Sequence, residues 1–191
     1  PAHINVSIIE KDNGNLIFCN SGVPRSWGGA VIEMDFISGN IDLKKYDNKN
    51  GVIDGFWWIY PPHVNSEYMV VNQIEKDQSG NIWVVNPFCE RYKHLLAVQS
   101  SDDNSWSHIN VPDSSSYRPQ AIDFDQSNRI WIGFAYDALD NNRIYSSGGI
   151  KVFNIIDSIW TLIDNPEKLP GNDSTASVWS LVFDEMGFLW V

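Results

Sequence analysis

Long apolar segments, basic residues and cysteines are all scarce in this chain of 191 residues. No apolar run approaches the roughly 20 residues that a membrane-spanning helix needs, so the sequence predicts none. Lys and Arg number 13 against 24 Asp and Glu, and the formal net charge is -11. This balance argues against a broad electrostatic grip on nucleic acid or on an anionic membrane, and favours a soluble, self-repelling surface.

The two cysteines, Cys19 and Cys89, have neither C-x-x-C spacing nor a neighbouring histidine pattern. Two buried thiols are the favoured interpretation, and a disulfide depends on geometry that the sequence does not give. Metal and catalytic motifs are also lacking: no H-E-x-x-H, G-x-S-x-G or phosphate-binding glycine loop occurs. The sequence therefore predicts no metal and no cofactor. The histidines that were searched for such spacing are His3, His63, His94 and His108.

A hairpin pattern recurs along the chain. In residues 74–86, IEKDQSGNIWVVN, an apolar residue leads into a polar turn and then into a β-rich run. Related segments begin at Ser7 (SIIEKDNGNLIFC), Ala121 (AIDFDQSNRIWIGF) and Ser180 (SLVFDEMGFLWV). Repeats at such intervals are typical of propellers and solenoids, so the repeat predicts where each structural unit begins.

Anchoring the copies on one aspartate each gives spacings of 65, 48 and 59 residues, by subtraction of the positions. An apolar residue lies three positions before each anchor, and another follows the turn. The anchors are Asp12, Asp77, Asp125 and Asp184, and the residues after the turn are Leu16, Ile82, Ile130 and Leu189. Trp83, Trp131 and Trp190 come next, with Ile17 in the first copy, whose turn we interpret as one residue shorter.

Each complete copy continues with two more predicted strands. These are 29–36 and 41–46, then 94–99 and 105–109, then 149–154 and 159–163. Four strands followed by a restart is one propeller blade. The predicted fold is all-β: a β-propeller of four-stranded antiparallel blades, about three blades plus part of a fourth, with an incomplete ring. The chain 1–191 is one partial domain with blades at about 4–46, 69–109, 120–163 and 177–191. A β-sandwich is the alternative architecture.

The motif D-x-x-G-N-I-W-V with a later glycine pair resembles the two-component regulator propeller repeat of bacteria. The glycine pairs are Gly28 with Gly29 and Gly148 with Gly149. Departures are Asn128 at the turn glycine, and Asn86 and Phe134 where the family usually has a small Thr. The resemblance implies a periplasmic or cell-surface protein, used for sensing in hybrid regulators or in secretion-associated surface proteins, and a fragment of a larger propeller.

The connections between the predicted strands differ in length on the two faces of the blades: short turns lie on one face and long connections on the other. Short turns fall at 12–15, 38–40, 77–81, 125–128 and 155–158, and long connections at 20–28, 47–68, 86–93, 110–119, 135–147 and 164–176. Long loops on a rigid scaffold often carry binding sites, so the long-loop face is the predicted functional face. The repeated tryptophans are interpreted as inter-blade packing, and the anchor aspartates as turn caps.

The aromatic insertion 51–68, GVIDGFWWIYPPHVNSEY, is the richest long loop. Flat aromatic rings with polar tips suit a sugar ring or a peptide, although such rings can equally plug the gap between blades. Pairs of an aromatic and a charged residue lie on the same predicted face. The candidate ligand-binding residues are Trp57, Trp58, Tyr60, His63, Arg91, Tyr92, Tyr117, Arg118 and Tyr136.

The leading hypothesis is a non-catalytic recognition or scaffolding propeller of an exported bacterial protein, contacting a glycan or a protein, with the remaining blades and downstream domains of the same polypeptide as further partners. The rival is a propeller enzyme, a lyase or a glycoside hydrolase, that uses His63 and a carboxylate from an adjacent long loop as acid and base. A third hypothesis is a purely structural scaffold.

Overall fold

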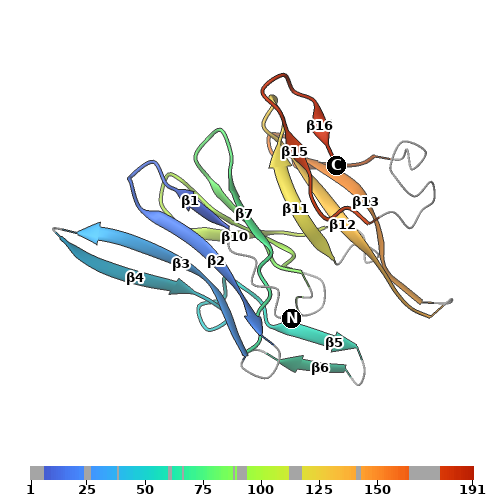
Figure 1. Cartoon of the computed structure of the whole chain (residues 1–191), viewed down its shortest axis with the longest axis horizontal. Coiled ribbons are helices and arrows are strands. Elements are labelled where there is room, and N and C mark those ends of the chain that lie inside the picture. The colour runs from blue at the N-terminus through green and yellow to red at the C-terminus, as the bar shows by residue number, and fades with distance from the viewer. Residues whose placement is uncertain are drawn as a thin grey trace. The chain divides into compact units, whose positions relative to one another are not determined.

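The computed structural model describes residues 7–23, 27–37, 39–59, 62–65, 67–87, 89, 94–111, 118–140, 143–163 and 177–191. Within these ranges every regular element is a β-strand (Figure 1), and no helix able to cross a membrane occurs. The strands form three four-stranded and two two-stranded sheets. The prediction of an all-β fold built from four-stranded antiparallel sheets is confirmed, whereas the number of blades and the incomplete ring stay predictions.

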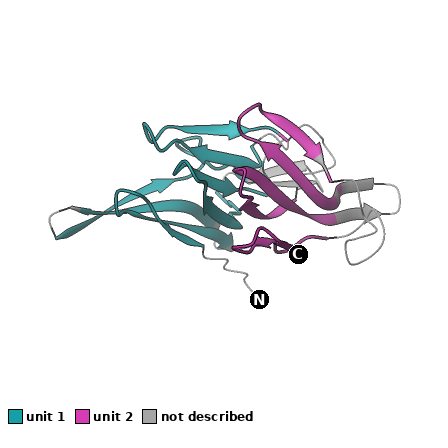
Figure 2. Ribbon diagram, turned by 90° about the horizontal axis from the view of Figure 1, so that it is seen from above, with its two compact units in different colours: residues 1–110 teal, residues 111–191 magenta. Residues whose placement is uncertain are grey.

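Residues 1–110 form one compact unit, shown in teal in Figure 2. Sheet 1 runs in the order β1 (Ile8–Glu10), β2 (Leu16–Val23), β3 (Trp27–Ile37) and β4 (Asn40–Tyr46). Sheet 2 contains β7 (Gln73–Lys76), β8 (Ile82–Val85), β9 (Leu96–Gln99) and β10 (Trp106–Ile109) in the same serial order. Between them in the sequence, β5 (Phe56–Ile59) and β6 (Pro62–Asn65) pair only with each other.

Residues 111–191 form the second compact unit. Sheet 3 runs in the order β11 (Pro119–Phe124), β12 (Arg129–Asp140), β13 (Arg143–Asn154) and β14 (Ile159–Leu162). The strands β15 (Val182–Phe183) and β16 (Leu189–Trp190) form a separate two-stranded sheet at the position of the fourth repeat copy. The fourth copy therefore shows only the first hairpin of the repeat within the described residues.

Each repeat copy after the first closes its turn with one aspartate. Asp77 Oδ1 accepts hydrogen bonds from the amides of Ser79 and Asn81, both at 2.9 Å, and Asp77 Oδ2 accepts the indole N–H of Trp83 at 3.0 Å. Asp125 does the same with Trp131 at 2.8 Å, and Asp184 with Trp190 at 2.9 Å. The predicted turn-capping role of these aspartates is confirmed, because one carboxylate accepts turn amides and anchors the strand that follows.

The prediction that Asp12 anchors the first copy is wrong. The amide of Lys11 donates to Asn15 O at 2.8 Å, and that of Gly14 to Lys11 O at 2.9 Å; this is the backbone pattern of Asp77, Asn81 and Gly80. The equivalent of Asp77 is therefore Lys11 and not Asp12, and the turn has the same length in both copies. Asp12 instead pairs with Lys76 at 2.9 Å. The sequence misled because the D-N-G order of residues 12–14 imitates the aspartate of the other copies.

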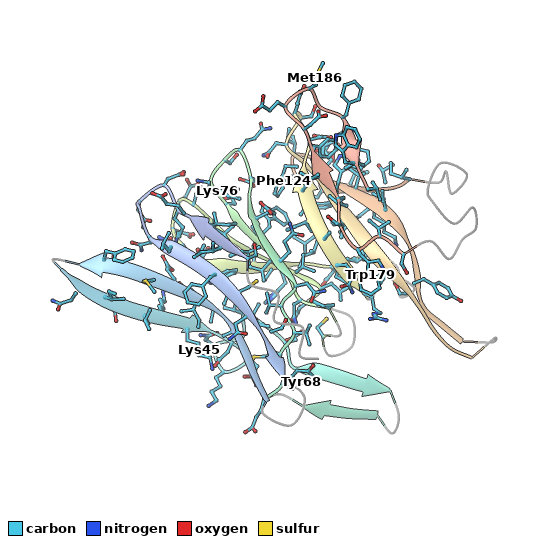
Figure 3. All side chains as sticks on the ribbon, viewed as in Figure 1. Lys45, Tyr68, Lys76, Phe124, Trp179 and Met186 are labelled. Atoms are coloured by element: carbon cyan, nitrogen blue, oxygen red, sulfur yellow. The ribbon has the colours of Figure 1, made fainter. Side chains whose placement is uncertain are left out.

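Side chains from the facing surfaces of sheets 1 and 2 form one apolar core (Figure 3). The inner face of sheet 1, including Ile17 at the position of Trp83, packs against the face of sheet 2 that carries Ile74 and Ile82. In the second unit, Trp131 packs edge-on against Phe183 with ring centroids 5.4 Å apart. Inter-sheet packing of the repeated tryptophan is thus confirmed for Trp131. For Trp190, which is 62% exposed, it stays a prediction.

Three connections that the sequence predicts as long loops contain strand pairs instead. In 47–68, β5 pairs with β6. In 20–28, β2 and β3 continue, so that Ser21 pairs with Gly29. In 135–147, β12 runs on to Asp140 and β13 begins at Arg143. In the first of the two glycine pairs, Gly29 adopts a φ of 99°, and a Cβ there would collide with Met69 O. Glycine allows a neighbouring backbone segment to bond at this point.

Both cysteines are buried and neither forms a disulfide, in agreement with the favoured interpretation. Burial, partly offset by hydrogen bonds from the backbone, raises the pKa of the Cys19 thiol above its ordinary value. Cys19 is therefore an inert member of the core rather than a reactive thiol.

Candidate ligand-binding site

The predicted site residues are distributed over both units. Trp57 and Trp58 lie in β5, where Trp58 is the direct cross-strand partner of His63 in β6. Arg118 and Tyr136 lie in the second unit, at neighbouring positions, because the amide of Ala135 donates to Arg118 O at 2.9 Å. The structure thus brings Trp58 close to His63 and Arg118 close to Tyr136. Tyr60, Arg91, Tyr92 and Tyr117 lie outside the described residues.

The two ends of the aromatic insertion are held together by one buried amide. Asn86, which is 1% exposed, accepts the amide N–H of Asp54 at 2.8 Å through Oδ1. Its Nδ2 donates to Val70 O at 2.8 Å and, more weakly, to Asp54 O at 3.4 Å. Asn86 departs from the small Thr expected at this position, and its longer side chain reaches both ends of the insertion. This amide fixes the base from which the β5–β6 hairpin projects.

A group of two histidines and one carboxylate lies at that base. His94 Nδ1 is buried and lies 2.8 Å from Asp54 Oδ2, an ion-pair distance without the angle of a hydrogen bond. The ring of His94 stacks on that of His108, with centroids 4.0 Å apart and planes inclined by 23°. His108 Nε2 is 3.0 Å from the carbonyl oxygen of Val52. We call Asp54, His94 and His108 the histidine cluster.

The surroundings of the histidine cluster define a donor on one ring and a charged neighbour for the other. A carbonyl oxygen only accepts, so His108 donates from Nε2 to Val52. The Asp54 carboxylate lies 2.8 Å from Nδ1 of His94, which leaves Nε2 as the ring nitrogen that is not beside the carboxylate. The side chains of His94 and Asp54 are 38% and 24% exposed, so the cluster is open to solutes. It offers a carboxylate and an oriented imidazole side by side.

Sequence reasoning missed this cluster, since it tested the histidines only for short-range spacing. Asp54 belongs to the long connection 47–68, and His94 directly follows the long connection 86–93. That shared position beside unrepeated loops was the available signal. The sequence did predict a His/carboxylate pair in the long loops, but with His63, whose side chain lies outside the described residues.

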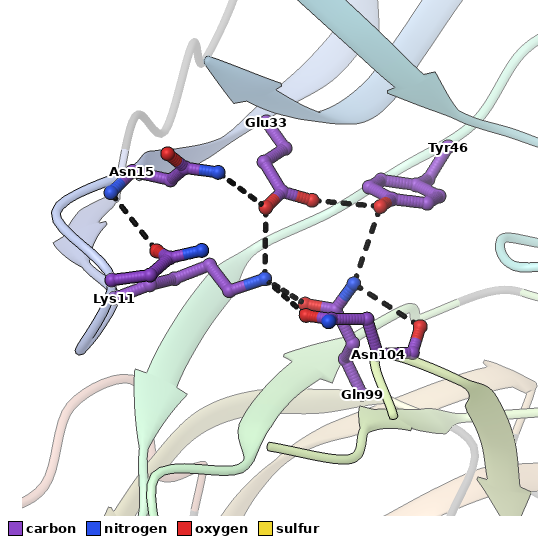
Figure 4. Close-up of polar contacts among 7 residues, drawn as sticks. Lys11, Asn15, Glu33, Tyr46, Gln99 and Asn104 are labelled. Atoms are coloured by element: carbon purple, nitrogen blue, oxygen red, sulfur yellow. Dashed lines mark hydrogen bonds and ion pairs between the residues drawn. The ribbon is translucent and has the colours of Figure 1, made fainter. Parts of the chain in front are cut away.

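A second polar group lies at the opposite, short-turn end of sheets 1 and 2 (Figure 4). Lys11 Nζ donates to Glu33 Oε1 at 2.8 Å, to Gln99 Oε1 at 3.1 Å and to Asn104 Oδ1 at 2.8 Å. Tyr46 Oη donates to Glu33 Oε2 at 2.7 Å. Lysine replaces the turn aspartate in this copy, and its ammonium group joins sheet 1 to sheet 2 instead of capping the turn.

The carboxyl group of Glu33 is held ionised by these partners. Burial alone would raise its pKa, but hydrogen bonds from Lys11, Tyr46 and Asn15, together with the charge of Lys11, lower the pKa to about 2. Burial and the hydrogen bond to Glu33 raise the pKa of Tyr46. Each member of this group is hydrogen-bonded to another, so the group links the two sheets. Removing one side chain would leave a buried polar or charged partner unsatisfied.

An open cavity of about 260 Å³ adjoins this polar group. Its size is below the roughly 300 Å³ at which pockets for drug-sized ligands begin. The lining residues come from both sheets and are Asn13, Asn15, Glu33, Asp35, Asp42, Lys44, Tyr46 and Asn104. Across the described ranges, no three His, Cys, Asp or Glu side chains are grouped so as to hold a metal ion.

Comparison with solved structures shows a similar fold but does not show an activity. The chain is similar to the extracellular domain of a one-component system of B. thetaiotaomicron, with a TM-score of 0.59 and 12% identity over 98% of this chain and 20% of that one. It is also similar to a protein named as a gluconolactonase, with a TM-score of 0.54 and 14% identity over 96% of this chain and 55% of that one. The chain thus spans about a fifth and just over half of their lengths.

At such identities the likeness concerns the fold alone. No family model matches the chain, and no curated protein matches it in sequence. The likeness to an extracellular domain of a one-component system is consistent with the two-component regulator propeller that the repeat resembles. Membership of that family stays a prediction.

Proposed function

We propose that this chain is a non-catalytic recognition domain of an exported protein, and that it binds a carbohydrate beside the histidine cluster. The observation that carries the proposal is the partly exposed pair of Asp54 and His94 at the base of the aromatic insertion. A carboxylate beside an imidazole offers acceptors and a donor to vicinal hydroxyl groups. The β5 strand begins two residues after Asp54 in the sequence and includes Trp57 and Trp58, a residue type whose flat face suits a sugar ring.

Rigidity of the cluster supports binding. Asn86 fixes the backbone of Asp54, and the stacked ring and the Val52 carbonyl fix the two imidazoles. A site whose polar groups are already held in place loses little conformational entropy when it binds. The likeness to an extracellular domain supports an exported location, in agreement with the repeat resemblance.

A glycan array followed by calorimetric titration of the best glycan tests the proposal. We expect His94→Ala and Trp57→Ala to weaken binding at least tenfold while the circular dichroism of the fold is unchanged. Trp179→Ala is the matched control, because Trp179 is an exposed tryptophan of the second unit. Binding that is equally strong in all three variants, or an array without any glycan bound, would refute the proposal.

The second candidate function is an enzyme, and the Asp54–His94 contact favours it specifically. An imidazole oriented by a carboxylate can act as a general base, here through Nε2 of His94. The cluster contains one carboxylate, whereas a glycoside hydrolase ordinarily needs two. Proton abstraction by a lyase therefore fits the cluster better than glycoside hydrolysis.

A panel of uronic acid polymers, followed by absorbance of the unsaturated product, tests the enzyme candidate. We expect His94→Gln to abolish turnover and Asp54→Asn to reduce it strongly if the chain is a lyase. If the wild-type chain binds a glycan but does not cleave it, the result supports the recognition function and refutes the lyase candidate.

A further inference from the structure

The open cavity of about 260 Å³ lies between the first two repeat copies, and Lys11 joins its two walls (Figure 4). One wall is the part of β3 and β4 that carries Glu33, and the other is the β9–β10 turn with Asn104. The ammonium group of Lys11 donates to Glu33 Oε1 and to Asn104 Oδ1, both at 2.8 Å. The walls are therefore fixed before a ligand binds, which lowers the entropic cost of binding.

Two carboxylates in the lining of this cavity face each other across two strands. Asp35 and Asp42 are direct cross-strand partners, next to the pair of Glu33 and Lys44 on the same face of sheet 1. Among the described residues, no ion pair or side-chain hydrogen bond engages Asp35 or Asp42. Like charges directly opposite each other in a sheet are destabilising. A cationic group between the two carboxylates would remove this repulsion.

A metal ion is a poor candidate for that cation. Glu33, the third carboxylate of the lining, already accepts hydrogen bonds from Lys11 and Tyr46. In the part of the chain that the structure describes, no three His, Cys, Asp or Glu side chains are grouped to hold a metal. An ammonium group needs only hydrogen-bond acceptors, and the two aspartates supply these.

The same cavity also offers donors. Lys44 Nζ lies over the ring of Tyr46, 5.0 Å from the ring centroid, and has no ion-pair partner within the described ranges. Asn13 accepts the amide N–H of Asn15 through Oδ1, and Asn104 accepts from Lys11 through Oδ1. Each of these two asparagines thus has its Nδ2 group left as a donor. The cavity combines a place for a cation with donors for an anion.

We propose that this cavity binds a free α-amino acid with a small polar side chain. The ammonium group of the ligand lies between Asp35 and Asp42, and its carboxylate accepts hydrogen bonds from Lys44 and the asparagine amides. The volume is below the roughly 300 Å³ of pockets for drug-sized ligands, which suits a small molecule. No aliphatic side chain lines the cavity, so a large apolar amino acid is disfavoured.

The proposal is independent of ligand binding at the histidine cluster, which lies at the other end of sheets 1 and 2. Titration of the whole chain with L-serine, followed by the side-chain amide resonances of Asn13 and Asn104, tests it. We expect both resonances to shift along one saturating curve, while the imidazole signals of His94 and His108 stay in place. Ethanolamine, which lacks the carboxylate, and 3-hydroxypropionate, which lacks the ammonium group, should each bind at least tenfold more weakly.

Variants of the charged lining residues locate the binding. Asp42→Asn and Lys44→Met should each weaken serine binding at least tenfold with unchanged circular dichroism, because both residues are exposed. Asp35→Asn provides a second carboxylate variant if Asp42→Asn fails to fold. The matched controls are Glu185→Gln and Lys49→Met, at exposed positions outside the lining, and they should bind as the wild type does.

Three results would overturn the proposal. The first is a wild-type chain that does not bind serine at millimolar concentration. The second is ethanolamine or 3-hydroxypropionate binding as strongly as serine, because one of the two charged groups would then be unnecessary. The third is serine binding that is equally strong in the lining variants and in the controls.

Discussion

Trp83 donates its indole N–H to Asp77 Oδ2 over 3.0 Å, and the same aspartate accepts the amides of the intervening turn. The bond recurs between Asp125 and Trp131 and between Asp184 and Trp190, including where the tryptophan is largely exposed. The pair therefore belongs to the hairpin itself, and it forms independently of burial by a neighbouring sheet.

Asp77→Ala should destabilise the chain by about 3 kcal/mol, because turn amides and the buried indole N–H lose their acceptor. Asp12→Ala is the control: Asp12 makes only an exposed pair with Lys76, and its loss should cost less than about 0.5 kcal/mol. Urea unfolding measures both values. Equal costs for the two variants would mean that Asp12 is the true equivalent of Asp77.

Much of this architecture could be predicted from the sequence, because hairpin turns depend on residues that are adjacent in the chain. The all-β class and the turn-capping aspartates followed from the repeat. The alignment of the first copy could not be predicted, because Asp12 resembles the anchor aspartates of the other copies. The backbone hydrogen bonds of Lys11 show that Lys11 is the equivalent residue. The histidine cluster joins Asp54 to residues that lie 40 and 54 positions further on, by subtraction. The sequence signal for it is weak, since Asp54 and His94 share only a place in or beside unrepeated loops.

The ion pair of Lys11 and Glu33 should make stability depend on pH in the acid range. The pKa of Glu33 is about 2 in the folded chain against an ordinary value of 4.5, so the folded state binds the proton more weakly than the unfolded state. Its contribution is complete above about pH 4.5 and is lost as the pH falls towards 2, on the order of 3 kcal/mol in all.

Glu33→Gln isolates this term, since other carboxylates titrate in both proteins. At pH 6 the variant should be less stable than the wild type by about 3 kcal/mol, because Lys11 loses its buried partner. The two stabilities should approach each other as the pH falls to about 2, where roughly half of the Glu33 carboxyl groups are protonated. Urea unfolding at several pH values measures the difference, and a difference that does not change with pH would contradict the assigned ion pair.

Gly29→Ala should cost more than Gly39→Ala, although both glycines have positive φ, 99° and 85°. Gly39 faces open space, so its variant pays only backbone strain of about 1–2 kcal/mol. At Gly29 the added Cβ also meets Met69 O, and the 67–69 segment must move. Thermal unfolding compares the variants, and similar midpoints would show that this backbone approach is not needed.

Asn86→Ala should loosen the base of the aromatic insertion without unfolding the sheets. The Asp54 amide and the Val70 carbonyl lose their shared partner, at a cost of about 1–3 kcal/mol. Hydrogen exchange should quicken at Asp54, whereas Asn110→Ala, at an exposed position, should leave the exchange unchanged. Unaltered hydrogen exchange in Asn86→Ala would show that the Asn86 side chain does not hold the base of the insertion.

The central claim, ligand recognition at the histidine cluster, is tested most directly by following the imidazole resonances of His94 and His108 during titration with the glycan that binds best. The account predicts that both signals shift in step with the calorimetric binding curve, and that His94→Ala abolishes the binding. A glycan that binds while both imidazole signals stay in place would contradict it.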